Sequence, residues 1–103
     1  MKDFLLEKRV AHYSLETIKE LIAKKNYKVT LSARQSYTAL GLNDDEVLEV
    51  IEKLTPRHLY KSMTSHNNHK LWHDVYHSKH EMIELYIKLQ VNDNAIIISF
   101  KEK

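Results

Sequence analysis

The spacing of apolar residues changes near the middle of the chain. In the first half, apolar side chains recur every three or four positions, which is typical of helices that bury one face. In the second half they alternate with polar side chains, which is typical of strands. This order predicts an α+β fold, in which a twisted antiparallel sheet carries about three N-terminal helices packed on one face. The other face should be at least partly open to solvent.

Each expected helix has a start or stop signal in the sequence. Ser14 is positioned to cap the first helix. Residues 32–35 (SARQ) form a capping-box pattern that predicts the start of the second helix, and Gly41 should end it. Residues 43–46 (NDDE) should cap the third helix, and Pro56 should stop it. The apolar positions predicted for the buried face of the third helix are Val47, Val50, Ile51 and Leu54.

Strands are expected mainly in the second half. The predicted segments are residues 27–30, 59–65, 71–77, 83–91 and 95–101. Tyr86 and Lys88 lie on the polar side of the clearest of them. On the last strand, Ile96, Ile98 and Phe100 are expected on one side, and Ile97, Ser99 and Lys101 on the other. Because neighbouring strands of a hairpin share their faces, Tyr86 and Lys101 should lie on one surface. Lys61 and His73 each alternate with apolar neighbours, so the pattern does not place them.

Composition narrows the class of protein. The chain has 103 residues with one glycine and one proline, which predicts a single domain, 1–103, without a flexible linker. It has no cysteine, so neither a disulfide nor a thiolate metal site can form. No apolar run reaches the roughly 18 residues that a membrane span needs, and the N-terminal apolar stretch is too short for a signal peptide. We therefore expect a cytoplasmic protein with no membrane partner.

The net charge of +2 is mildly basic, which permits nucleic-acid binding without demonstrating it. Lysines beside a tyrosine on a sheet suit RNA, because lysines hold phosphates and aromatic rings stack on bases. Exposed lysines are also common on sheets, where they discourage edge-to-edge aggregation. The pattern alone leaves both interpretations open.

Histidines are concentrated in one stretch of the chain. Five of the seven are His66, His69, His73, His77 and His80. The spacing of the last three would allow a zinc site on a helix. The surrounding residues are more typical of a strand, which would hold His73 and His77 on one face but well apart. We therefore expect no metal site, and we assign His66, His69 and His80 to exposed loops.

Four segments of the chain carry a recognisable signature. They are residues 59–65 (LYKSMTS), 71–76 (LWHDVY), 85–89 (LYIKL) and 96–103 (IIISFKEK). In order and spacing they resemble the pattern FYKSMTT, IWQDVY, VYLKI and VLIVSFKEK of the MqsR family of toxins. The resemblance covers about residues 7–103, and the final SFKEK is identical.

This resemblance implies a RelE-like ribonuclease fold and an mRNA interferase, the toxin of a type II toxin–antitoxin system that arrests growth. Toxins of this family cut mRNA at GC-containing triplets, without the ribosome and without a metal, so no cofactor is expected. An antitoxin, MqsA, silences them and itself binds operator DNA. We therefore expect mRNA and an MqsA-like antitoxin as partners, and no specific DNA binding by the toxin alone.

The resemblance also implies the site residues. The catalytic residues are expected to be Lys61, His73, Tyr86 and Lys101. The expected RNA contacts are Lys61, Ser62, Lys88 and Lys101. His73 departs from the family, which usually has glutamine there. Glutamine only hydrogen-bonds, whereas histidine also transfers a proton, since its ordinary pKa is about 6.5. His73 should therefore either position the RNA or act as an acid–base group, in a cleavage that leaves 2′,3′-cyclic phosphate and 5′-hydroxyl ends.

Two other functions are weighed against this one. Residues 33–54 read as helix, turn, helix, which resembles a DNA-binding helix-turn-helix. The second helix, however, would begin with three acids at the end that should enter the major groove, where phosphates would repel them. The other alternative is a non-catalytic module that docks to a partner by the edge of its sheet.

Overall fold

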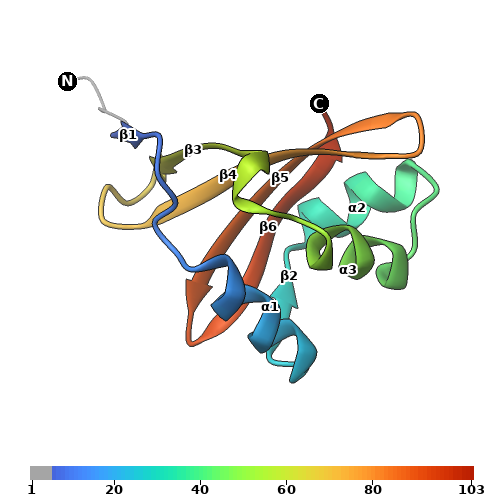
Figure 1. Ribbon diagram of the computed structural model, residues 1–103, viewed down its shortest axis with the longest axis horizontal. Helices are drawn as coiled ribbons and strands as arrows, with labels where there is room; N and C mark the ends of the chain where they lie inside the picture. Colours follow the sequence, from blue (N-terminus) through green and yellow to red (C-terminus); the bar gives the residue numbers. More distant parts are fainter. Residues whose placement is uncertain (1–5) are drawn as a thin grey trace.

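Within residues 6–103, which the structure describes, three α-helices pack against one face of a six-stranded sheet (Figure 1). The structure is a computed structural model. The α+β class expected from the sequence is confirmed, and the layout is consistent with the RelE-like toxin fold. No helix in this part of the chain is long and apolar enough to cross a membrane.

The three α-helices and the last five strands follow the chain in the expected order, whereas the strand at Glu7–Lys8 and the 3-10 helix at Pro56–His58 were not predicted. The helices are α1 (Leu15–Ala23), α2 (Leu31–Ala39), α3 (Asp44–Glu52) and the short 3-10 helix η1 (Pro56–His58). The strands are β1 (Glu7–Lys8), β2 (Tyr27–Val29), β3 (Leu59–Thr64), β4 (Trp72–His80), β5 (Ile83–Asn92) and β6 (Asn94–Glu102). Across the sheet the strands lie in the order β1-β3-β4-β5-β6-β2.

The sheet is mixed, which corrects the expectation of an antiparallel one. Four of its neighbouring pairs are antiparallel, but β2 runs parallel to β6. A short turn forces two strands to be antiparallel, whereas strands far apart in the sequence are free to pair either way. Strand β2 lies far from β6 along the chain, so local patterns carry no information about this pairing.

Local signals place two of the three helix starts correctly. At α1, Ser14 Oγ accepts a hydrogen bond from the backbone N–H of Thr17 at 3.3 Å. At α3, the side chains of Asn43 and Glu46 accept from each other's backbone N–H groups, at 2.8 and 3.0 Å. Gly41 follows α2 with a φ of 82°, the left-handed conformation that ends many helices.

Two expected boundaries are wrong. Thr30, rather than Ser32, caps α2. Its Oγ1 accepts a hydrogen bond from the backbone N–H of Ala33 at 3.1 Å and donates one to the carbonyl of Ile98 at 2.8 Å. The cap is therefore stabilised by β6, which is distant in sequence. Helix α3 ends at Glu52, and Pro56 begins η1 instead of stopping α3.

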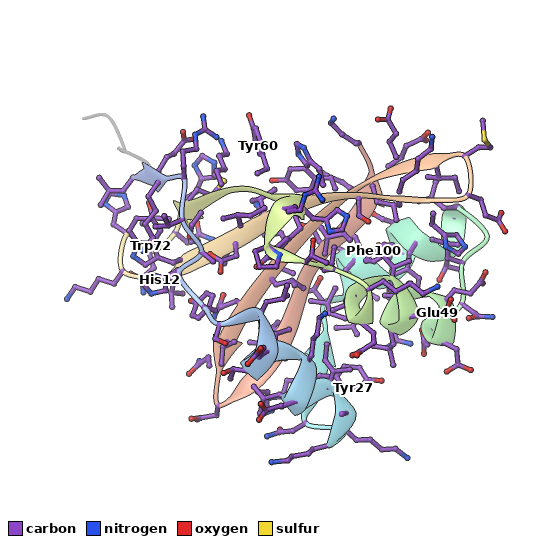
Figure 2. The ribbon with its side chains drawn as sticks, viewed as in Figure 1. His12, Tyr27, Glu49, Tyr60, Trp72 and Phe100 are labelled. Atoms are coloured by element: carbon purple, nitrogen blue, oxygen red, sulfur yellow. The ribbon has the colours of Figure 1, made fainter. Side chains whose placement is uncertain are left out.

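The hydrophobic core lies between the helices and the sheet face that they cover. The predicted burial is confirmed for Val47, Val50 and Ile51 of α3 and for Leu54, which lies just beyond the end of this helix. The strands contribute Tyr76, Leu85, Ile87, Leu89, Ala95, Ile97 and Phe100. The ring of Phe100 meets Tyr37 of α2 edge-on, with centroids 5.8 Å apart, and Figure 2 shows it beside this helix.

A β-bulge in β6 corrects the expected phase of that strand. Lys88 pairs with Ser99 but Leu89 pairs with Ile97, which leaves Ile98 as an extra residue. A bulge shifts the alternation of side chains by one position. Ile97 therefore faces the core with Phe100, whereas Ser99 keeps the predicted orientation away from it.

Asp74 of β4 fastens the segment before α1 to the sheet. Its side chain is fully buried and accepts hydrogen bonds from the backbone N–H groups of His12 and Tyr13, at 2.9 and 2.8 Å. The hydroxyl of Tyr13 donates to the carbonyl of Trp72 at 2.7 Å, and the rings of His12 and Trp72 stack at 5.2 Å (Figure 2). The aspartate of the W-x-DVY segment therefore has a structural role, on the side of the sheet away from the candidate site.

Candidate functional site

The sheet face away from the helices, here called the open face, gathers the cationic residues expected at the site. Lys61, Val75 and Lys88 pair directly across β3, β4 and β5, so their side chains share one face. In the adjacent row, His77, Tyr86 and Lys101 pair across β4, β5 and β6. Strand register therefore brings Lys61, which the sequence pattern could not place, onto the same face as Tyr86 and Lys101.

Two lysines flank the ring of Tyr86, and the charge of a third, Lys61, is felt by its hydroxyl. The Nζ atoms of Lys101 and Lys88 lie 5.1 and 5.9 Å from its centroid. Burial, together with the charges of Lys101 and Lys61, lowers the pKa of Lys88. This mutual repulsion indicates a concentrated positive potential, which an anion such as a phosphodiester would relieve.

Tyr86 is placed to donate a proton rather than to remove one. Burial raises the pKa of Tyr86, and the charge of Lys61 opposes this rise. A phenol with a raised pKa stays protonated at neutral pH, so its hydroxyl is available as a hydrogen-bond donor or general acid.

His73 also lies on the open face, but in a different row. It pairs with Met63, which follows Lys61 by two positions on β3. Its Nε2 is 2.9 Å from Oε1 of Gln90, a residue that is 6% exposed. Burial and the charge of Lys88 lower the pKa of His73. A neutral imidazole that donates through Nε2 to an amide oxygen is well suited to a positioning role.

The expected residue Ser62 does not line this surface. It pairs with Asp74, is fully buried, and its Oγ lies 3.4 Å from the carbonyl oxygen of His73. Strand alternation turns it away from its neighbour Lys61. We therefore withdraw Ser62 as an RNA contact, whereas Lys88 remains a candidate.

Several residues at the site were not expected from the sequence. Glu7 of β1 lies 2.5 Å from the ammonium of Lys61, and this hydrogen bond lowers the pKa of the Glu7 carboxyl. Tyr60 is the extra residue of a bulge in β3, and its ring stacks on His77 at 4.3 Å. Figure 2 shows Tyr60 pointing away from the helices. Arg9 donates to the carbonyl of Tyr60 at 3.1 Å.

The sequence held a signal for only some of these residues. Tyr60 belongs to the signature segment, and His77 was noticed only as one of the clustered histidines. Glu7 and Arg9 reach the site through the pairing of β1 with β3, which links positions more than fifty residues apart. No local pattern reports such a pairing.

The clustered histidines do not converge on one point. His73 and His77 face the open side of β4, whereas His80 lies on the other side of the strand, 3.6 Å from a carboxylate oxygen of Glu46. Among residues 6–103, no group of three His, Cys, Asp or Glu side chains is arranged to hold a metal ion.

Comparison with known proteins shows the family of the chain. Residues 10–102 match the model of the family described as "Motility quorum-sensing regulator, toxin of MqsA". The chain is also 37% identical over 98 residues to a protein of Escherichia coli (strain K12) named "mRNA interferase toxin MqsR", a match that covers 95% of this chain and 100% of that protein. The two matches span nearly the whole chain, and the chain therefore belongs to the MqsR toxin family.

Proposed function

We propose that this protein is an mRNA interferase, an endoribonuclease that acts as the toxin of a toxin–antitoxin pair. The observation that carries this proposal is the open face itself, where Lys88 and Lys101 flank Tyr86 and Lys61 lies in the adjacent row. Membership of the MqsR toxin family supports the same activity, since the relative in Escherichia coli is named an mRNA interferase.

The proposed reaction uses the nucleophile that RNA carries. The 2′-hydroxyl loses its proton to a base and attacks the adjacent phosphorus, and the bond from phosphorus to the 5′-oxygen breaks. The leaving oxygen takes a proton from an acid, so the products are a 2′,3′-cyclic phosphate and a 5′-hydroxyl. The protein must orient the attack, stabilise the phosphorane and move these two protons.

Lys61 and Lys101 are proposed to stabilise the negative charge that develops on the phosphorane. They belong to adjacent rows on either side of Tyr86, so their ammonium groups can approach the same phosphate. Removing one such donor from an enzyme typically slows it about 100-fold or more. Tyr86, which stays protonated, would donate to the leaving oxygen.

His73 is proposed to position the RNA. Its hydrogen bond to Gln90 leaves one ring nitrogen to contact the substrate, which is also what an amide side chain could do. This role agrees with the glutamine usual at this position in the family. A His73→Gln variant should then keep most of the cleavage rate and the same pH profile, whereas a flattened profile below pH 7 would favour the acid–base role.

The finer properties of the reaction are also proposals. Like its family, the enzyme is expected to cut free mRNA at GC-containing triplets, without the ribosome and without a metal, in the cytoplasm. Cleavage of a defined RNA by the purified protein, with EDTA and without ribosomes, tests the triplet preference and the independence of ribosome and metal together. Loss of cleavage on adding EDTA would contradict the metal-independent mechanism.

Growth arrest on induction tests the activity in cells. We expect wild-type protein to arrest growth, the Lys61→Ala variant not to, and an MqsA-like antitoxin produced alongside to restore growth. Lys24→Ala is a matched control, because Lys24 is an exposed lysine at the end of α1, on the helical side of the molecule. Equal arrest by wild type and by Lys61→Ala would contradict a catalytic site on the open face.

The two alternatives are less well supported. The first turn of α3 carries Asp44, Asp45 and Glu46, and carboxylates at this end would repel DNA phosphates. A module that docks only by a sheet edge would present β1 or β2, which have two and three residues. Cleavage of RNA by purified protein would exclude the non-catalytic alternative.

A further inference from the structure

His77 lies in the same row of the open face as Tyr86 and Lys101. It pairs directly with Tyr86, which pairs directly with Lys101. One face of the His77 ring stacks on Tyr60 at 4.3 Å, and its centroid is 6.0 Å from that of Tyr86. Among the described residues, neither ring nitrogen of His77 has a hydrogen-bond partner, in contrast to His73, which is held by Gln90.

His77 lies closer along β4 to a phosphate bound at Tyr86 than His73 does. His73 and His77 are four residues apart on one strand, which separates them by about 13 Å. The row of Lys61 and Lys88 lies between them. A phosphate bound over Tyr86 and Lys101 would therefore lie beside His77 and far from His73.

We propose that His77 is the general base of the cleavage reaction, the group that accepts the proton of the RNA 2′-hydroxyl. This inference rests on the proposed ribonuclease function and adds to it a catalytic residue. The proton moves from the 2′-oxygen to a free ring nitrogen of His77 as the bond from the 2′-oxygen to phosphorus forms. Tyr86 gives a proton to the departing 5′-oxygen, and His77 and Tyr86 later return to their starting protonation states by exchange with water.

The charges around His77 keep its imidazole in the form that this role needs. Burial and the charge of Lys103 lower the pKa of His77, whereas Glu84 raises it. The titratable groups that contact the ring are Tyr60 from β3 and Tyr86 from β5; Lys61 and Arg9 lie over the Tyr60 ring, and Lys101 pairs with Tyr86. Because burial and Lys103 together outweigh Glu84, the pKa of His77 lies below its ordinary value, and the ring is neutral and able to accept a proton at pH 7.

The test compares two matched substitutions on the same face of β4. Single-turnover cleavage of a defined RNA is measured from pH 5 to pH 9 for wild type, His77→Gln and His73→Gln. General-base catalysis contributes about 100-fold to 10,000-fold. We expect His77→Gln to lose at least 100-fold in rate at pH 7.5 together with the acidic limb of the profile, and His73→Gln to keep that limb.

Two further measurements separate chemistry from structure. An RNA with a 2′-deoxy nucleotide at the cleavage point lacks the reacting hydroxyl, so it binds without being cut. Its affinity should be the same for wild type and His77→Gln, because a general base acts on the reaction and not on binding. Cleavage by His77→Ala should be restored in part by added imidazole, in proportion to its neutral form. A substrate with sulfur in place of the leaving 5′-oxygen needs no acid, so His77→Gln should remain slow on it.

The possible outcomes are distinct. If wild type does not cut RNA, the proposed function fails. If wild type cuts RNA and His77→Gln keeps its rate and pH profile, the assignment of His77 fails alone. Rescue of His77→Gln by the sulfur-containing substrate would make His77 the acid and overturn its assignment as the base. Loss of the acidic limb in His73→Gln alone would transfer the role to His73.

Discussion

Replacing Asp74 by asparagine should destabilise the protein strongly, although the substitution barely changes the size of the side chain. Asp74 is fully buried, and each of its carboxylate oxygens accepts one backbone N–H, from His12 and from Tyr13, at 2.9 and 2.8 Å. Asparagine retains one acceptor, but its NH₂ group would face the other N–H, donor against donor.

The expected magnitude follows from these two hydrogen bonds. One hydrogen bond to a charged acceptor is lost, which costs about 1.5–3 kcal/mol, and one buried N–H is left unsatisfied at a cost of about 1–3 kcal/mol. Because the two effects overlap, we expect the free energy of unfolding to fall by about 2–4 kcal/mol. For a domain of this size, the corresponding fall in Tm is at least about 8 °C.

Urea unfolding followed by far-UV circular dichroism and by tryptophan fluorescence would measure this change. Trp72 is the only tryptophan, and it stacks on His12 within the segment that Asp74 holds, so its fluorescence reports on the anchor itself. Asp93→Asn is the control: Asp93 is exposed in the β5–β6 turn with a φ of 64°, which asparagine also tolerates. The control should stay within about 0.5 kcal/mol of wild type. Equal urea midpoints for Asp74→Asn and wild type would refute the assignment of Asp74 as a buried anchor.

Three further predictions concern a helix cap, a titrating group and an ion pair. Asn43→Ala removes the N-cap of α3 and should lower the free energy of unfolding by about 1 kcal/mol, measured by urea titration; an unchanged midpoint would contradict this. Burial and the charge of Lys88 lower the pKa of His73. The stability that its neutral form contributes is therefore present above about pH 6.5 and is lost as the pH falls through the lowered pKa. The free energy of unfolding should fall less between pH 7 and pH 5 for His73→Gln than for wild type, and an equal fall in both proteins would contradict this prediction. Glu7→Gln frees the ammonium of Lys61, so a non-cleavable RNA should bind more tightly. The slope of log affinity against log salt concentration should steepen by up to about 0.7, as fluorescence anisotropy would show. Weaker binding would instead mean that Glu7 orients this lysine for RNA.

Predictions from the sequence were most accurate where neighbours along the chain decide the structure. The capping box of Asn43 and Glu46 and the turn at Gly41 depend on residues within one helical turn, and both are present. The alternation along β5 placed Tyr86 on the open face, because a strand turns successive side chains to opposite sides. The resemblance to the MqsR family added the identity of the site residues, which periodicity alone did not supply.

The tertiary structure decided how these pieces combine into a surface. Pairing with β4 brought Lys61 beside Lys88 and turned Ser62 into the interior, and register placed His77, rather than His73, opposite Tyr86. The bulge at Ile98 and the parallel partner of β2 also depend on strands that are distant in sequence. Strand register is set by the burial of a whole face and by bulges that relieve local mismatch, so it is a property of the assembled sheet. The sequence by itself therefore determined the three α-helices, strands β2 to β6 and the chemistry available, whereas only the folded sheet added β1 and determined which of those side chains meet.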